Sequence, residues 1–298
     1  MGFFKTYMNR PKQKTVAREV VFTGIGVHSG SCARVVVQPN IDKTGIVFHH
    51  KDYPGDDIVI GKVIPELAMH ATVVKARSWY LSTIEHLMAT FHMLGITQAH
   101  VYVDAFEIPI LDGSALGFVQ GFLDVGLSVC EEDLLFLTPR QTLSFADEQG
   151  RSIEIAPFDR ASLGDETAML HISYVADFSN PLLGRSYFEG GLTACSFIDH
   201  IAPARTFGFL EQLPMLRSHG LARGASLGNT VVLSNEEFLN DRRFEDECVR
   251  HKVLDFLGDV ALLGYPLAAS VRAVKTGHSF NRRVVEHFLT TPDQWALF

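Results

Sequence analysis

The predicted secondary structure repeats its order along the chain, because each half starts with strands and ends with helices. Alternating apolar residues predict strands over residues 15–22, 33–38, 45–49 and 99–103, and helical periodicity predicts helices over 82–94 and about 115–125. After an acidic stretch at 130–133, further strands are predicted over 142–145, 152–156 and 170–175, before a long helix over about 245–263. This order predicts an α+β fold with two domains, residues 1–132 and 133–298.

Length and composition agree with two globular domains. The chain has 298 residues, enough for two domains of ordinary size or one large one, and 47% of them are apolar, which excludes a disordered chain. The net charge of −8 argues against a nucleic-acid partner, because such proteins usually present a basic face. Nothing in the sequence indicates an obligate protein partner.

Cysteine usage and hydropathy indicate the compartment. The four cysteines are scattered, with no C-x-x-C pair, which is typical of reduced thiols in a cytoplasmic protein. No stretch approaches the roughly 18 apolar residues of a membrane span, so we expect no transmembrane segment. Any lipid that this protein handles must therefore come to it.

The predicted long helix has an unusual polar stripe on an otherwise apolar surface. His251 and Asp255 are four residues apart, so their side chains share one face and can bind one ion, and Asp259 continues that face. The alternative is a His–Asp pair that faces solvent.

A second cluster, Ser82 to His86, has two interpretations. Ser82 and Glu85 have the spacing of a capping box, in which Glu85 would only cap the following helix. Alternatively, Glu85 is a general base beside a metal that His86 binds. Two histidines and one carboxylate would leave a position open for water, as in catalytic zinc sites, and the same donors also suit Fe²⁺.

A third segment, residues 275–278 (KTGH), is interpreted either as a simple turn or as the source of a general acid, His278. The glycine before the histidine permits close approach of another group.

Seven runs, in this order, resemble the UDP-3-O-acyl-N-acetylglucosamine deacetylase family, and the resemblance extends over about residues 15–287. They are 23–30 (TGIGVHSG), 82–87 (STIEHL), 107–114 (EIPILDGS), 204–209 (ARTFGF), 243–247 (RFEDE), 251–255 (HKVLD) and 275–278 (KTGH). The resemblance implies two similar domains with their helices sandwiched between two sheets, and an active site in the cleft between the domains.

The resemblance also implies a role for each matching residue. His86, His251 and Asp255 would bind Zn²⁺, Glu85 would be the general base, and His278 the general acid. The remaining roles are a charge partner for His278 at Asp259, an oxyanion contact at Thr206, substrate and phosphate contacts at Lys252 and Lys275, and sugar-nucleotide packing at Phe207.

An insert at about 178–201 is expected to form an apolar passage for the acyl chain, with Leu192 and Phe197 among its lining residues, although periodicity alone would place these two in an ordinary core. One departure from the family lies at 224–229, where this chain reads GASLGN and has Gly228 in place of an aspartate.

The implied activity is hydrolysis of the N-acetyl group of an acylated UDP-sugar, a step of lipid A biosynthesis. The alternatives are a related zinc amidase with another substrate, a non-catalytic homologue that binds the sugar nucleotide, and an Fe²⁺ oxygenase. The oxygenase would need a site for a redox co-substrate, which the sequence does not offer. A non-catalytic homologue would have no need to keep every ligand, base and acid.

Overall fold

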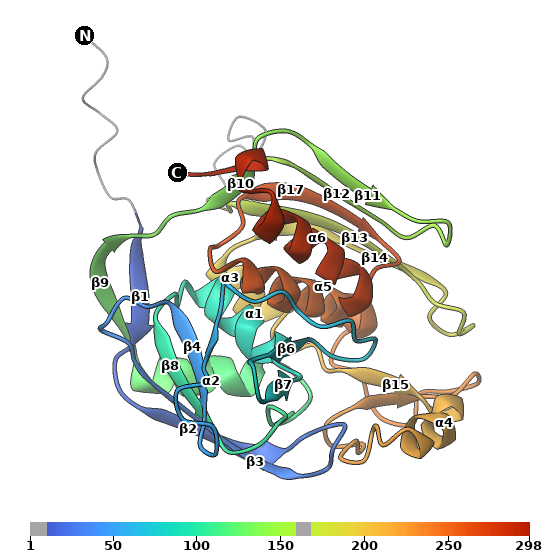
Figure 1. The fold of residues 1–298 in the computed structure, drawn as a ribbon. Coiled ribbons are helices and arrows are strands. Elements are labelled where there is room, and N and C mark those ends of the chain that lie inside the picture. The colour runs from blue at the N-terminus through green and yellow to red at the C-terminus, as the bar shows by residue number, and fades with distance from the viewer. Residues whose placement is uncertain (1–10, 159–167) are drawn as a thin grey trace.

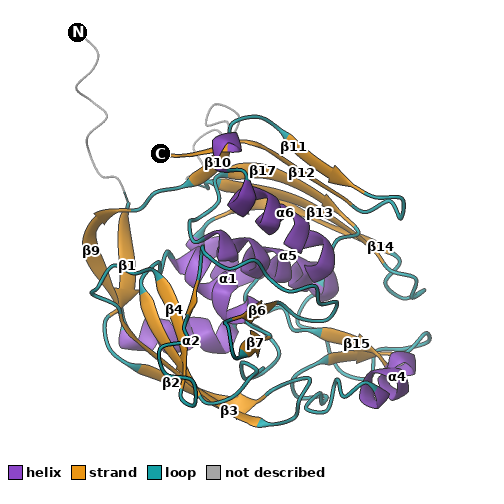
Figure 2. Cartoon of the chain, viewed as in Figure 1, coloured by secondary structure: helices purple, strands orange, loops and turns teal. Residues whose placement is uncertain are grey.

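The computed structural model describes residues 11–158 and 168–298 and has two five-stranded sheets with helices between them (Figures 1 and 2). The expected α+β fold with helices sandwiched between two sheets is therefore confirmed. Figure 2 shows the strands of the two sheets on opposite outer sides and the main helices in the middle.

The first sheet belongs to the first half of the chain. Its strand order is β2-β3-β8-β4-β5, all neighbours being antiparallel except β8 and β4. The strands are β2 (Val20–Ile25), β3 (Cys32–Pro39), β4 (Ile46–His50), β5 (Ile58–Val59) and β8 (Ala99–Val103), and the helices that follow β5 and β8 are α1 (Glu85–Leu94) and α2 (Leu116–Val125).

The second sheet has the same topology. Its order is β11-β12-β17-β13-β14, and again only the central pair, β17 and β13, is parallel. The strands are β11 (Leu143–Ala146), β12 (Ser152–Pro157), β13 (Leu170–Asp177), β14 (Arg185–Leu192) and β17 (Ala269–Val274), and the corresponding helices are α5 (Glu247–Val260) and α6 (His278–Thr290). The two halves are thus similar, as expected.

Shorter elements surround the two sheets. Strand β9 (Leu127–Asp133) pairs with β1 (Lys12–Val16), whereas β10 (Leu137–Pro139) pairs with β18 (Trp295–Leu297). These pairings are compatible with a domain boundary near residue 132, which stays a prediction. The other short elements are β6 (Val73–Lys75), β7 (Tyr80–Ser82), β15 (Phe207–Phe209), β16 (Val231–Leu233), α3 (Ala194–His200), α4 (Leu213–Ser218) and three 3₁₀ turns at Leu210–Gln212, Ala261–Leu263 and Pro292–Gln294.

The structure corrects two of the predicted elements. Residues 15–22 form parts of two strands, because the chain turns after Val16 and the Ala17 amide donates to the Gly126 carbonyl (2.8 Å). The first helix begins at Glu85 rather than at residue 82, because Ser82 belongs to β7 and pairs there with Val73.

Helices α1 and α5 meet in the centre of the molecule, and a glycine permits the contact. A Cβ atom at Gly258 of α5 would lie 2.1 Å from the carbonyl oxygen of Glu85, at the start of α1. A side chain is therefore excluded at this point. The close approach places the first turn of α1 against the polar face of α5, where the candidate site lies.

Candidate active site

Three side chains from the two central helices converge on one point. His86 comes from α1, and His251 and Asp255 are one turn apart on α5. All three are buried, and one donor atom from each lies within 4.8 Å of the others. The helical spacing of His251 and Asp255 predicted their common face, but only packing of α1 on α5 brings His86 to them.

The state of these side chains suits a divalent metal ion. His251 Nδ1 is 3.0 Å from the Ala204 carbonyl, which can only accept, so Nδ1 carries the proton and Nε2 offers its lone pair beside Asp255 Oδ1 (3.3 Å). Buried His86 Nδ1 has no hydrogen-bond partner among the described residues. Two imidazoles and one carboxylate are a donor set for Zn²⁺ or Fe²⁺.

The pKa values agree with this donor set. Burial lowers the pKa of His86 to about 3, and it also lowers the pKa of His251, so both imidazoles are neutral. Burial alone would raise the pKa of Asp255, but Lys252 and the surrounding histidines hold it well below its usual value. The site therefore presents two neutral imidazoles and an ionised carboxylate, the forms that bind a metal.

Glu85 points into the same site and does not cap its helix. The residue before it, Ile84, is the N-cap of α1, and the Glu85 carboxylate accepts instead from the Thr72 amide (Oε2 to N, 3.0 Å). Ser82 Oγ donates to the Phe106 carbonyl (3.1 Å). The capping-box interpretation of Ser82 and Glu85 is therefore wrong. Burial raises the pKa of Glu85 to about 7, and the nearby His278 opposes this rise.

His278 lies opposite Glu85 and is held by Asp259. Its Nδ1 is 3.1 Å from each Asp259 oxygen, and its Nε2 is 3.8 Å from Glu85 Oε1 and from Asp255 Oδ2. Burial would lower the pKa of His278, but Asp259 and the other carboxylates raise it to about 9. His278 is therefore protonated near neutral pH, beside a carboxylate that can accept a proton.

Thr72 is a site residue that sequence reasoning missed. Its amide donates to Glu85, its hydroxyl donates to Asp259, and the same oxygen is 3.1 Å from His278 Nδ1. It thus connects the candidate base with the candidate acid. It lies just before β6, ten residues before the 82–87 run, and a threonine at that position has no sequence signal.

A cavity of about 540 Å³ opens next to these groups, and its lining comes from both halves of the chain. The lining includes the predicted substrate contacts Thr206, Phe207 and Lys252. Lys252 Nζ is 2.6 Å from Asp255 Oδ2 and lies 5.8 Å from the centre of the Phe207 ring. Thr206 is held at both backbone groups, since its amide donates to the Gly113 carbonyl (2.7 Å) and its carbonyl accepts from Val231 (2.8 Å).

Three other predicted contacts lie elsewhere in the structure. Leu192 and Phe197 are buried in the hydrophobic core, as periodicity alone would have placed them, and residues 178–201 mainly form β14 and α3. Lys275 pairs with Asp177 at a partly exposed position (2.7 Å). Phe178, the first residue of the predicted insert, lines the cavity, but most of its apolar wall comes from a later part of the chain, namely Phe209, Leu210, Leu213, Leu216, Leu227, Val232 and Leu239.

The altered loop at 224–229 closes through its last residue. The Asn229 side chain accepts from the Ser226 amide (2.8 Å) and donates to the Gly224 carbonyl (3.0 Å). A Cβ at Gly113, where φ is +88°, would lie 1.8 Å from the Asn229 carbonyl oxygen, so the loop packs directly on the first half. The loop is thus built from Asn229 hydrogen bonds, with Gly228 in the turn between them.

Fold and site together have the features of a metal-dependent hydrolase of the α+β class: a candidate His₂Asp donor set lies beside a buried carboxylate and a protonated histidine. The family model for UDP-3-O-acyl N-acetylglycosamine deacetylase matches residues 13–290, and the chain belongs to this family.

Relatives with the name UDP-3-O-acyl-N-acetylglucosamine deacetylase agree with this assignment. The protein of Syntrophotalea carbinolica is 36% identical over 96% of this chain and 90% of its own. That of Chromobacterium violaceum is 35% identical over 95% of this chain and 92% of its own. That of Campylobacter hominis is 33% identical over 96% of this chain and 94% of its own.

Among the described residues, no helix is both long and apolar enough to cross a bilayer.

Proposed function

We propose that this protein hydrolyses the N-acetyl group of UDP-3-O-(3-hydroxyacyl)-N-acetylglucosamine, releasing acetate and the free amine, the committed step of lipid A biosynthesis. The observation that carries the proposal is the convergence of the metal donor set with Glu85 and His278 at the wall of one cavity. The chain's membership of the deacetylase family supports the amide bond as the target.

The ion that we propose is Zn²⁺, bound by His86, His251 and Asp255; when bound, it supplies a Lewis acid that polarises a carbonyl and acidifies water. Glu85 accepts the proton of the attacking water. His278, kept cationic by Asp259, donates a proton to the leaving amine as its bond to the acetyl carbon breaks. Thr206 stabilises the negative charge that develops on the carbonyl oxygen.

Substrate contacts follow from the cavity walls. We assign the sugar-nucleotide side to Phe207 and Lys252, which line the cavity close to Asp255. Lys275 would contact a phosphate after leaving Asp177, and such an exposed ion pair is weak enough to be exchanged for a phosphate contact. The acyl chain is assigned to the apolar wall at 207–239 together with Phe178, the first residue of the insert predicted at 178–201. All four cysteines are described and free, which fits the reducing cytoplasm, the compartment that we propose.

The direct test is an acetate-release assay combined with metal analysis of purified protein. We expect one ion per chain, loss of activity on chelation and its recovery with Zn²⁺. Protein that binds metal but releases no acetate from the acylated UDP-sugar would point to another amide substrate. Protein that binds neither metal nor substrate would contradict the proposal.

The acyl-chain assignment predicts a substrate-dependent effect of Leu216→Glu. Leu216 lines the cavity from α4 and is only half-buried, so a charge there should disturb ligand binding more than folding. Burying a leucine-sized contact is worth roughly 1.5–3 kcal/mol, so kcat/KM for the long-chain substrate should fall by about tenfold or more. A substrate without the chain should lose much less.

Met215→Glu is the matched control for this experiment, because Met215 belongs to the same helix but is 49% exposed. It should leave both substrates nearly unchanged. Equal losses on both substrates in Leu216→Glu would show a folding defect and would remove the acyl chain from this wall.

A further inference from the structure

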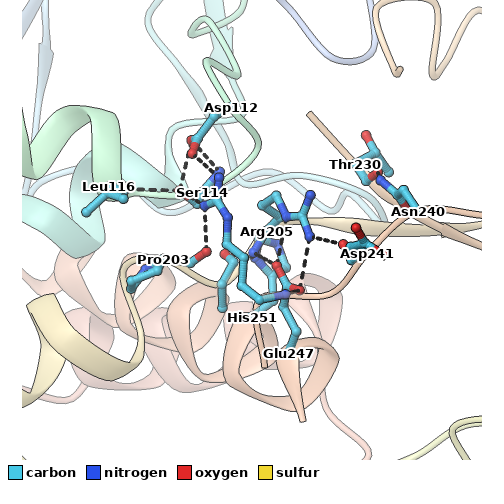
Figure 3. Close-up of polar contacts among 12 residues, drawn as sticks. Asp112, Ser114, Leu116, Pro203, Arg205, Thr230, Asn240, Asp241, Glu247 and His251 are labelled. Atoms are coloured by element: carbon cyan, nitrogen blue, oxygen red, sulfur yellow. Dashed lines mark hydrogen bonds and ion pairs between the residues drawn. The ribbon is translucent and has the colours of Figure 1, made fainter. Parts of the chain in front are cut away.

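Glu247, the first residue of α5, is a buried carboxylate to which no catalytic role has been given. Its side chain is 0% exposed, and its two oxygens accept four hydrogen bonds. Three come from Arg205, namely from its amide (3.0 Å), Nε (2.9 Å) and Nη2 (3.2 Å), and the fourth comes from the Arg243 amide (2.6 Å). Figure 3 shows Arg205 and Glu247 joined in this way.

These hydrogen bonds keep the carboxylate ionised. Burial would raise the pKa of Glu247, but the hydrogen bonds and charge of Arg205 hold it below its usual value. A buried ion pair by itself is weak evidence for stability, since desolvation cancels most of the attraction. The importance of the pair for the site therefore depends on which neighbouring groups it holds in place.

Arg205 belongs to the segment 203–206, in which each residue has a backbone group held by a hydrogen bond. The Pro203 carbonyl accepts from Arg243 Nη1 (2.8 Å), the Ala204 carbonyl accepts from His251 Nδ1 (3.0 Å), and the Arg205 amide donates to Glu247. The next amide, that of Thr206, donates to the Gly113 carbonyl (2.7 Å). One segment thus contacts the metal ligand His251 and supplies the proposed oxyanion group Thr206.

The same network reaches the first half of the chain. Arg243, whose amide is held by Glu247, donates from Nη2 to Asp112 Oδ2 (2.8 Å) and from Nη1 to Ser114 Oγ (3.2 Å). These two residues flank Gly113, the partner of Thr206. Figure 3 shows Asp112 and Ser114 above Arg205, and His251 and Glu247 below it. Through Arg243, Glu247 therefore helps to hold the second half of the chain against the turn at 112–114 of the first half.

We propose that Glu247 is a positioning residue for the active site: by fixing Arg205 and Arg243, it holds the Ala204 carbonyl against His251 Nδ1 and keeps Thr206 at the reacting carbonyl. This inference rests on the proposed function. A displaced Ala204 carbonyl would leave the Nδ1–H group of His251 without its acceptor and let the imidazole rotate, so Nε2 would no longer face Asp255. Loss of such an outer hydrogen bond typically costs about 10–100-fold in metal affinity or activity.

The test is Glu247→Gln in the full-length protein, with Co²⁺ as a spectroscopic metal. Glutamine keeps the shape of the side chain but lacks its charge. Its NH₂ group is a donor and would face the N–H donors of Arg205 or Arg243, so hydrogen bonds would be lost. We expect the Kd for Co²⁺ to rise about 10–100-fold, the Co²⁺ visible spectrum to change, and kcat to fall about tenfold or more with little change in KM.

Asp246→Asn is the matched control. Asp246 is the neighbouring residue and also pairs with an arginine, Arg250 (Oδ1 to Nε, 2.5 Å), but Arg250 donates its other side-chain hydrogen bond to the His200 carbonyl and makes none to residues 203–206. This variant should keep the Co²⁺ affinity, spectrum and kcat of the parent.

The outcomes separate two kinds of failure. Parent protein that binds no Co²⁺ would refute the proposed function. Parent protein that binds Co²⁺, with Glu247→Gln equal to it in Kd, spectrum and kcat and lower only in Tm, would show a purely structural ion pair and overturn the positioning role. If Glu247→Gln does not fold, Arg205→Lys decides, because it keeps the charge but cannot reproduce the hydrogen bonds from Nε and Nη2.

Discussion

Glu85→Gln should lower kcat by about 10²–10⁴-fold, the usual contribution of a positioned proton-transfer group. Glutamine has nearly the same shape and can still accept from the Thr72 amide, but it cannot take a proton from water. Metal content should equal that of the parent, because the donor set is His86, His251 and Asp255. The measurement combines acetate release with metal analysis.

Two results would contradict this prediction. Nearly full turnover of Glu85→Gln would show that another group, or the activated water alone, manages the proton. A parallel loss of metal and activity would show that Glu85 belongs to the donor set, and the site would have to be redrawn with four protein ligands.

His278→Ala should cause a loss of similar size, about 10²–10⁴-fold, and should also remove the alkaline limb of the pH profile. Activity requires ionised Glu85 and protonated His278. It should therefore rise as the pH rises through the pKa of Glu85, at about 7, and fall as the pH rises through that of His278, at about 9. A bound cation would shift the acidic limb to lower pH, because it favours the carboxylate.

The measurement is kcat against pH for the parent and for His278→Ala. The two groups are 3.8 Å apart, so the apparent values describe the coupled pair. An alkaline limb that persists in His278→Ala would assign it to another acid, and loss of the metal in this variant would make His278 a ligand.

The duplicated topology explains where the site lies. In each half, four strands of the five-stranded sheet come before a central helix, and the last sheet strand and a second helix follow it, so α1 and α5 are equivalent helices in this order. Their mutual contact places His86 from one helix against His251 from the other, with ring centres 5.0 Å apart. The metal donors thus lie where the two equivalent helices touch.

Local interactions were predictable from the sequence because they depend on neighbours in the chain. The helical period placed His251, Asp255 and Asp259 on one face of α5, and the resemblance to the deacetylase family predicted the fold, which is confirmed, as well as the base and the acid, which stay predictions. The capping-box prediction failed although its spacing was correct, because contacts with more distant residues decide the position: the backbone of Ser82 pairs in a strand, and the Thr72 amide holds the Glu85 carboxylate.

The relations between distant segments were decided only by the tertiary structure. The apolar wall at 207–239, the Thr72 bridge and the contacts of Glu247 with residues 203–206 have no periodic signal, because hydrogen bonds and cavity walls join residues that are far apart in the chain. The sequence by itself determined which chemical groups are present and which helix faces display them. Packing of α1 on α5, permitted by the missing side chain of Gly258, determined that these groups meet.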